Sequence, residues 1–214
     1  MLLHDRTELF AVRGSDVVQR ETKLARAVAH HFHCRLNGNG IDLAEERIDQ
    51  LQVSQLQLLN ASVADTAVFY SRNMSLGINL LIMLCKKASQ VLGEDFDIEI
   101  IEKHHNKKLD APSGTALMLA DAISETFDGG KDYVYERQSV RRQREKREIG
   151  IHAVRGGTIV GQHDVIFAGK DETVTLAHEA TSREVFATGA LKAAEFMVGK
   201  TSGLYNMDDM LSEL

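Results

Sequence analysis

The alternation of apolar and polar residues along this chain predicts helices and strands in an order typical of an α/β fold. Residues 7–12 and 66–70 are short apolar runs, each of which predicts a strand. Between them, residues 20–32 and 41–60 place apolar side chains at roughly helical spacing, and the Asn-Gly-Asn-Gly sequence at 37–40 predicts a turn. The first third therefore reads as strand, helix, turn, helix, strand.

The pattern becomes clearer from residue 75 onward. Ser75 and Gly93 bracket a predicted helix over 76–92, and Ser113 is a plausible N-cap for a second helix over 114–127. Residues 97–102 alternate as in a strand that ends at a cluster of charged residues. Three β-rich runs follow at 148–157, 158–169 and 172–180, and turns of Gly or charged residues separate them, which predicts an antiparallel meander. Residues 183–199 and 206–214 return to helix.

Size, charge and cysteine content narrow the class of protein. The 214 residues are 43% apolar, which is enough for a substantial core, and the net charge of −6 gives no basic field for nucleic acid or an anionic membrane. The two cysteines lie far apart, as suits a reducing compartment. The first ten residues lack the pattern of a signal peptide, and the most apolar run, 76–85, is about half the length that spans a bilayer. We therefore expect a soluble, cytoplasmic protein that binds neither nucleic acid nor a membrane.

The stretch EKHHNKKLDAPSGT at 102–115 carries the candidate chemistry. The free amides at a helix N-terminus can hold a carboxylate or phosphate, Gly114 lets the anion approach the backbone, and Thr115 adds a hydroxyl donor. Lys108 could donate a proton, and either His104 or His105 could exchange one near neutral pH. Neighbours on an extended chain point to opposite sides, so the two histidines are not expected to share one role. The simpler alternative is a solvated polar loop before an ordinary helix start.

The same stretch closely resembles the signature of the dihydrodipicolinate reductase (4-hydroxy-tetrahydrodipicolinate reductase) family, E-x-H-H-x-x-K-x-D-[AS]-P-S-G-T-A. Further segments that resemble the family are RNMSLGINLL, VRGGTIVGQHDVIFAG, REVFATGALKAA and SGLYNMDDML, so that the resemblance covers roughly residues 66–214. It implies that the chain reduces a cyclic, unsaturated dicarboxylate with NADH or NADPH in lysine and diaminopimelate biosynthesis, and that it forms a homotetramer through its sheets.

The resemblance also implies roles for individual residues. His104 matches the family's proton donor and acceptor, and Lys108 matches its catalytic proton donor. His105 matches a substrate contact, and Gly114 with Thr115 matches the pair that grips a substrate carboxylate. The cofactor-side loop matches Ser71, Arg72, Asn73 and Met74, with Arg72 where a small residue is usual. The nicotinamide loop matches Asn37, Gly38, Asn39 and Gly40.

The N-terminal part departs from the family pattern. Family members open with a strand and a Gly-rich loop, G-x-x-G-x-M-G, that seats the cofactor pyrophosphate at a helix N-terminus, and this sequence contains no such motif. We therefore expect an incomplete Rossmann-like domain over residues 1–73. An α+β domain with a mixed sheet over 74–198 would bind substrate and form the oligomer, and residues 199–214 would return to the first domain. A catalytically silent relative that binds the dicarboxylate or oligomerises without turnover, and the truncated product of a longer gene, are the alternatives.

Two other charged or metal-binding patterns have simpler explanations. The run RRQREKRE at 141–148 has five basic and two acidic residues but no interleaved aromatics, so we interpret it as a solvated loop rather than a nucleic-acid patch. His30 and His33 have a spacing seen in metal sites on helices, but no second pair of ligands accompanies them, and we predict no metal site.

Overall fold

The computed structural model describes residues 8–12, 64 and 66–213, which belong to two compact units. Residues 71–192 belong to the first unit, and residues 9–12, 66–70 and 193–210 to the second. The predicted helices at 20–32 and 41–60, the Asn37–Gly40 turn and the histidines at 30 and 33 lie outside the described residues.

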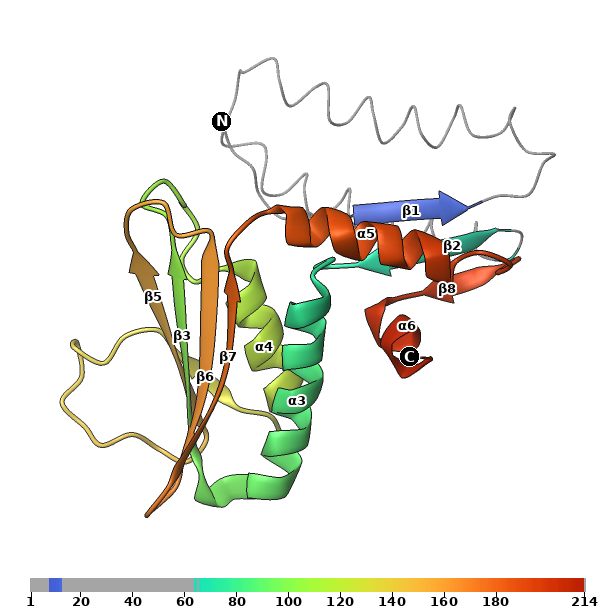
Figure 1. Ribbon diagram of the computed structural model, residues 1–214. Coiled ribbons are helices and arrows are strands. Elements are labelled where there is room, and N and C mark those ends of the chain that lie inside the picture. Colours follow the sequence, from blue (N-terminus) through green and yellow to red (C-terminus); the bar gives the residue numbers. More distant parts are fainter. Residues whose placement is uncertain (1–7, 13–63, 65, 214) are drawn as a thin grey trace, which may run out of the picture. The chain divides into compact units, whose positions relative to one another are not determined.

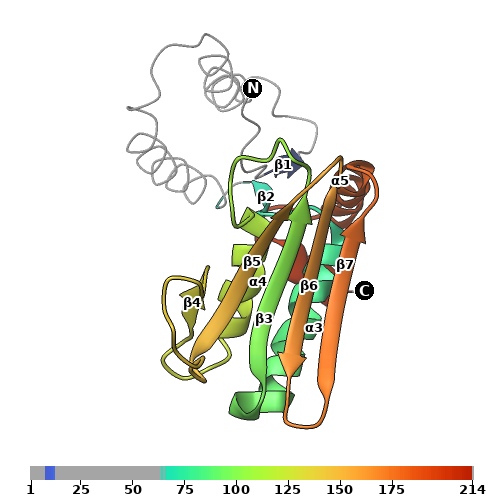
Figure 2. The ribbon, with the colours of Figure 1, turned by 90° about the vertical axis from the view of Figure 1, so that its left-hand side faces the viewer.

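The first unit is built on a five-stranded mixed sheet in the order β4-β5-β3-β6-β7 (Figures 1 and 2). The strand bounds are Asp132–Val134 for β4, Glu148–Arg155 for β5, Asp97–His104 for β3, Gly161–Ala168 for β6 and Thr173–Ala180 for β7. Strand β3 lies parallel to β5 and antiparallel to β6. Strands β4 and β5 are parallel, and β6 and β7 are antiparallel. The α/β class and the mixed sheet predicted from the sequence are both confirmed.

The predicted three-run meander is wrong in one respect, because β3 is inserted between β5 and β6. Ile98 and Ile100 of β3 are fully buried, and a strand in the middle of a sheet satisfies its backbone groups along both edges. The chain from β5 to β6 therefore crosses the end of β3. There Gly156 N donates to His104 O (2.9 Å) and Asn106 N donates to Gly157 O (3.2 Å).

Two helices cover one face of this sheet, and the opposite face is turned to the viewer in Figure 2. Helix α3 spans Leu76–Leu92, and Ser75 is its N-cap, with Ser75 Oγ accepting from Ile78 N at 3.3 Å. Helix α4 spans Gly114–Ser124, and Ser113 Oγ accepts from Ala116 N at 3.2 Å. Both predicted N-caps are confirmed, and α4 ends three residues earlier than the sequence pattern suggested.

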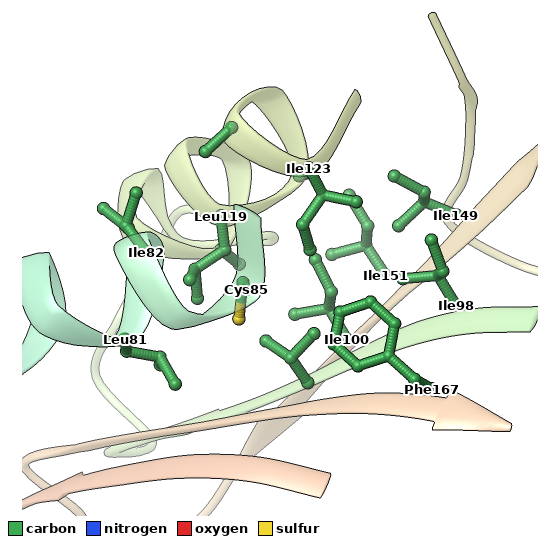
Figure 3. Close-up of a cluster of buried hydrophobic side chains, with 14 of the residues drawn as sticks. Leu81, Ile82, Cys85, Ile98, Ile100, Leu119, Ile123, Ile149, Ile151 and Phe167 are labelled. Atoms are coloured by element: carbon green, nitrogen blue, oxygen red, sulfur yellow. The ribbon is translucent and has the colours of Figure 1, made fainter. Parts of the chain in front are cut away.

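The hydrophobic core lies between these helices and the sheet (Figure 3). The side chains that form its centre come from α3, α4, β3, β5 and β6 and include Leu81, Cys85, Ile98, Ile100, Leu119, Ile123, Ile149, Ile151, Val165 and Phe167. On β3 and β6 every second residue points into this layer, as strand geometry requires. Burial raises the pKa of the Cys85 thiol to about 12, so Cys85 is an inert core residue.

Helix α3 with the short 3₁₀ turn η1 (Gly93–Asp95) that follows is long and apolar enough to cross a membrane by composition alone. However, Ile78, Leu81 and Cys85 on one side of α3 are buried in the core. This is how the covering helix of an α/β layer packs, so the apolar character of α3 is explained by the fold.

The charged loop between β4 and β5 is mostly exposed, in agreement with the solvated loop predicted from the sequence, and ion pairs also tie it to the sheet. The Glu148 carboxylate is buried and accepts from Arg137 at 2.6 Å, and it pairs with Arg142 at the same distance. The Arg144 guanidinium reaches Glu99 (3.2 Å) and the carbonyl of Glu148 (2.7 Å). These arginines are therefore engaged with carboxylates of the same unit and do not form an open basic patch.

In the second unit, β2 (Ala67–Ser71) pairs in parallel with β8 (Gly203–Tyr205), and β1 (Glu8–Val12) lies on the other side of β2. The strands β1 and β2 were predicted from the sequence, whereas β8 was not. Helix α5 (Glu184–Phe196) belongs to the first unit up to Lys192 and to the second from Ala193, and helix α6 (Met207–Ser212) belongs to the second up to Met210. Both helices agree with the helical patterns near the C-terminus. The Phe196 ring packs edge-on against Phe69 and Tyr205, with ring centroids 6.1 and 5.8 Å apart.

Candidate active site

The candidate site lies at the end of β3, where the inward-facing row of side chains changes from apolar to charged. Ile98 and Ile100 belong to the core, and the next two positions on the same face are Glu102 and His104. Strand β3 extends two residues beyond the predicted 97–102, so His104 is held on regular strand backbone. The strand period of two therefore aligns a carboxylate and an imidazole directly beyond the core.

Strand pairing brings two more polar side chains to this point. Across the antiparallel β3–β6 pair Glu102 lies opposite His163, and across the parallel β3–β5 pair His104 lies opposite Arg155. The His104 and His163 rings pack edge-to-face with centroids 5.3 Å apart. His163 Nε2 is 3.1 Å from Ser113 Oγ, which joins this cluster to the start of α4.

Glu102 is the buried centre of the cluster, with no exposed side-chain surface. Arg155 donates to both carboxylate oxygens, at 2.6 and 2.8 Å, and His104 Nδ1 lies 2.6 Å from Oε2. Burial raises the pKa of Glu102, but the hydrogen bonds and positive charges of His104 and Arg155 outweigh it and bring the pKa to about 2. Glu102 is therefore ionised at neutral pH.

His105 and Lys108 lie on the loop that follows β3 and have partners different from those of His104. The Arg183 guanidinium is 3.4 Å from His105 Nε2, and Lys108 Nζ is 2.8 Å from Asp110 Oδ2. Burial, and then the positive charges of Arg183, His104 and Lys108, lower the pKa of His105. A neutral His105 beside two cations is suited to hydrogen bonding an anion rather than to carrying a charge itself.

The first turn of α4 offers backbone donors next to this cluster. Ser113 N donates to Glu102 Oε1 at 3.0 Å, and Ser113 Oγ caps Ala116. Helix geometry leaves the amides of Gly114 and Thr115 without an intrahelical acceptor. Thr115 Oγ1 accepts from Asn73 Nδ2 at 3.1 Å, so the hydroxyl hydrogen of Thr115 remains available for a ligand.

The predicted cofactor-side loop is held mostly by bonds within itself. Ser71, Asn73 and Met74 are buried, Ser71 Oγ donates to Asn73 O at 2.7 Å, and Asn73 Oδ1 accepts from Ser75 N at 2.9 Å. Only Arg72 extends outward, with a side chain 49% exposed and 3.5 Å from Asp121. The other four predicted cofactor residues, Asn37, Gly38, Asn39 and Gly40, lie outside the described residues.

Four polar residues of the site were given no role from the sequence, namely Glu102, Arg155, His163 and Arg183. All four lie in segments that resemble the family. Glu102 and His163 could have been found from the strand period, because each continues an inward-facing apolar row by two residues. Arg155 and Arg183 carry no such signal, since their positions depend on strand order and on the start of α5.

A separate hollow of about 290 Å³ contains none of the predicted site residues. It is lined by Lys103, Gln162, Asp164, Ala177, His178 and Glu179, and Lys103 Nζ pairs with Asp164 Oδ2 at 2.9 Å. Because Lys103 and Asp164 in its lining pair with each other, we place the candidate active site at the Glu102 cluster instead.

The site predicts how the stability of the protein depends on pH. Burial and the charge of His104 lower the pKa of His163 from 6.5 to about 3, and the pKa of Glu102 falls from 4.5 to about 2. In both cases the unfolded chain binds protons more readily than the folded one, so acid favours unfolding. We expect the free energy of unfolding to decline as the pH falls below about 6.5 and more steeply below about 4.5.

Urea unfolding at a series of pH values checks this expectation. His163→Gln should reduce the decline between pH 6.5 and 4.5. A free energy of unfolding that stays constant between pH 7 and 5 would show that His163 is not held neutral.

A carboxylate–histidine cluster beside an anion-holding helix start is suited to binding a small carboxylate and moving a proton. Comparison with known proteins assigns the family. Residues 77–211 match the family described as "Dihydrodipicolinate reductase, C-terminus", and the chain therefore belongs to the dihydrodipicolinate reductase family.

Curated relatives carry the name 4-hydroxy-tetrahydrodipicolinate reductase. The protein of Caldanaerobacter subterraneus subsp. tengcongensis is 56% identical over 163 residues, which cover 76% of this chain and 64% of the relative. The protein of Clostridium novyi is 57% identical over 144 residues, covering 67% of this chain and 57% of the relative. The chain thus spans less than two thirds of the length of these relatives.

A solved structure is also similar. It is the dipicolinate-bound dihydrodipicolinate reductase from Paenisporosarcina sp. TG-14, with a TM-score of 0.55 and 26% sequence identity. The match covers 86% of this chain and 69% of that protein.

Proposed function

We propose that this chain carries the substrate half of a reductase that converts 4-hydroxy-tetrahydrodipicolinate to tetrahydrodipicolinate in lysine and diaminopimelate biosynthesis. The observation that carries the proposal is the junction at Glu102. Its carboxylate contacts His104 at the end of β3 and accepts from Ser113 N at the start of α4 (3.0 Å). One buried group therefore joins a proton-exchanging cluster to an anion-holding helix start.

A dicarboxylate needs two anion sites, and the unit offers two groups of donors. The amides of Gly114 and Thr115 and the Thr115 hydroxyl would hold one carboxylate. Arg183 with the neutral His105 would hold the other, since the guanidinium can bind a carboxylate through two parallel N–H groups. Within residues 66–213, His105 Nδ1 has no hydrogen-bond partner but is buried, so the guanidinium of Arg183 would make the direct contact with the carboxylate.

The 4-hydroxyl of the substrate leaves as water, and reduction of the resulting unsaturated ring adds a hydride to one atom and a proton to another. Lys108 is the proposed proton donor, because its ammonium lies in the same loop as His105, where it faces Asp110 at 2.8 Å. His104 is the proposed proton donor and acceptor. The partial positive charge at the start of α4 would stabilise the carboxylate while the proton moves.

NADH or NADPH, when bound, would supply the hydride. Among the described residues that were predicted to contact it, Ser71, Asn73 and Met74 are buried, and Asn73 instead binds Thr115. Arg72 is the one whose guanidinium is half exposed, and it would exchange its ion pair with Asp121 (3.5 Å) for a cofactor phosphate. Its side chain would select for a negatively charged part of the cofactor.

We further propose a cytoplasmic homotetramer that associates through the face of the five-stranded sheet opposite α3 and α4. The support is that Ile101, Val154 and Ile166 lie on that face, and Val154 is 44% exposed. Light scattering coupled to size exclusion would give the mass of the assembly. The proposed division into residues 1–73, 74–198 and 199–214 stays a prediction.

Two measurements on the purified chain test the function. Calorimetry with dipicolinate tests the substrate side, and oxidation of NADH or NADPH in the presence of the pathway precursor tests turnover. Binding with turnover supports the reductase. Binding without cofactor-dependent turnover would support the silent relative, and absence of dipicolinate binding at millimolar concentration would refute the dicarboxylate site.

Thr115→Val is expected to weaken dipicolinate binding about tenfold, because loss of one hydrogen bond to a charged group costs roughly 1.5 kcal/mol or more. Valine keeps the shape of the side chain and removes only the hydroxyl. Thr173→Val is the matched control, since Thr173 begins β7 at the end of the sheet away from His104. Equal affinity in the Thr115 and Thr173 variants would exclude the hydroxyl as a ligand.

A further inference from the structure

The Glu102 carboxylate has donors on both of its oxygens. Oε1 accepts from Arg155 Nη2 (2.6 Å) and from Ser113 N (3.0 Å). Oε2 accepts from Arg155 Nη1 (2.8 Å) and faces His104 Nδ1 at 2.6 Å. A carboxylate has about four lone-pair sites, and the guanidinium and the backbone amide are donors only. Three of the sites are therefore filled by obligate donors, and two of these belong to the permanently charged guanidinium of Arg155, which holds Glu102 in its ionised form.

The fourth contact must then be a hydrogen bond donated by His104. An ionised carboxylate is an acceptor only, so the ring nitrogen 2.6 Å from it has to carry the hydrogen. A neutral imidazole has one N–H, and when it lies on Nδ1 the other nitrogen, Nε2, is an acceptor. The low pKa of Glu102, about 2, is consistent with this arrangement over the whole neutral range.

The surroundings of Nε2 differ from those of Nδ1. A side chain at Gly161 would begin 3.2 Å from His104 Nε2, so glycine at this position keeps that side of the ring uncrowded. His163 packs edge-on against His104, but its own Nε2 is engaged with Ser113 Oγ at 3.1 Å. His163 therefore does not compete for the Nε2 atom of His104.

We propose that Glu102, clamped by Arg155, is a positioning residue that holds the His104 ring with Nδ1–H directed at its carboxylate, so that Nε2 is the nitrogen that exchanges the proton. This inference rests on the proposed function only for the use of that proton, because the ring orientation is a property of the folded chain itself. Glu102 acts through His104 and need not touch the substrate.

Several charged groups surround His104, and we assign the positioning role to Glu102. Arg155 on β5 and Glu102 on β3 form the buried pair, and His163 faces the ring from β6. On the loop after β3, Lys108 and His105 add charge or polarity, since both His104 and Lys108 depress the pKa of His105. Of these groups, Glu102 is the carboxylate in hydrogen-bond contact with the ring.

Two-bond ¹H–¹⁵N spectra of ¹⁵N-histidine-labelled protein report which ring nitrogen carries the hydrogen, and a His104→Gln sample assigns the signals. At pH 8 we expect His104 of the wild-type chain in the Nδ1–H form. In Glu102→Gln the amide can donate to Nδ1 instead of accepting, so the Nε2–H form should become at least half of the population. If Glu102 were only a structural contact, its loss would broaden the histidine signals or unfold the protein, and it would not favour the other tautomer.

Glu99→Gln is the matched control, because Glu99 also lies on β3 and faces His152 Nε2 at 2.7 Å, but on the other side of the strand. It should leave the His104 signals unchanged. Should Glu102→Gln fail to fold, the wild-type spectrum still decides the matter. His104 in the Nε2–H form in the wild type, or in the same Nδ1–H form in a folded Glu102→Gln, would overturn the proposal, whether or not dipicolinate binds.

Discussion

Replacing Lys108 with alanine is expected to lower kcat by about 10²- to 10⁴-fold, the range that a positioned general acid or base contributes. Lys108 is part-buried, its ammonium is 2.8 Å from Asp110, and it lies one turn after His105, with Lys108 N donating to His105 O at 3.1 Å. Truncation removes the proposed proton donor and leaves the strand and helix that frame the site intact. Initial rates of NADPH oxidation with the pathway precursor, together with a thermal unfolding curve, measure the two effects.

Lys107→Ala is the control for this experiment, because Lys107 is the preceding residue and is exposed to solvent. It removes the same charge from the same loop without removing the proposed donor, and its kcat should stay within about twofold of the wild type, as for most exposed substitutions. A Lys108 variant that turns over at the wild-type rate, or two variants with equal losses, would refute the role of Lys108 as proton donor.

Replacing Arg155 with methionine is expected to destabilise the fold by about 3–5 kcal/mol, because it removes one partner of a buried ion pair and leaves the other uncompensated. Arg155 donates two hydrogen bonds to Glu102, which is fully buried, and a third to the carbonyl of Asp110 at 2.7 Å. Methionine keeps much of the aliphatic volume, so the loss is mainly electrostatic. The midpoint of urea unfolding at pH 7 measures it.

Arg147→Met is the matched control for Arg155. Arg147 pairs with Asp132 at 3.4 Å on the surface, and both side chains are more than half exposed. Exposed pairs of this kind contribute about 0–1 kcal/mol, so the control should unfold near the wild-type midpoint. Equal midpoints for the Arg155 and Arg147 variants would mean that Glu102 is not held as a buried charge. In that case, adding Glu102→Gln to Arg155→Met would not raise the midpoint of urea unfolding either.

Local signals in the sequence predicted the elements well where one residue type determines the geometry. Ser75 and Ser113 were recognised as helix caps, because their side-chain oxygens satisfy amides that a helix start leaves unpaired. Strand β3 was recognised from the alternation of Ile98 and Ile100 with polar residues, but its end was placed two residues too early. The error arose because Lys103 and His104 look like the start of a loop, whereas both pair with β5.

Strand order was the part of the fold that local signals could not supply. The runs at 148–157 and 158–169 follow each other and resemble a hairpin, yet β3, about fifty residues earlier, lies between them. Pairing between strands distant in sequence depends on which strand has apolar residues on the helix-covered face and free backbone on both edges. An interpretation that compares each segment only with its neighbours in the sequence cannot determine which distant strands pair.

For the site, the sequence by itself determined the residues with local chemistry, namely His104, His105, Lys108 and the Gly114–Thr115 helix start. Their spacing on one strand, loop and helix is fixed along the chain, and the resemblance to a reductase family attaches to that same stretch. Their functional roles stay predictions for the experiments above.

Only the tertiary structure decided what surrounds them. Arg155 reaches Glu102 because β5 lies parallel to β3, and His163 reaches His104 because β6 lies antiparallel on the other side. Each contact joins residues more than fifty positions apart. The physical reason is that a buried carboxylate must be satisfied by whatever donors the packed strands bring to it. The sequence identifies the histidine, and the folded sheet determines which of its ring nitrogens faces the carboxylate.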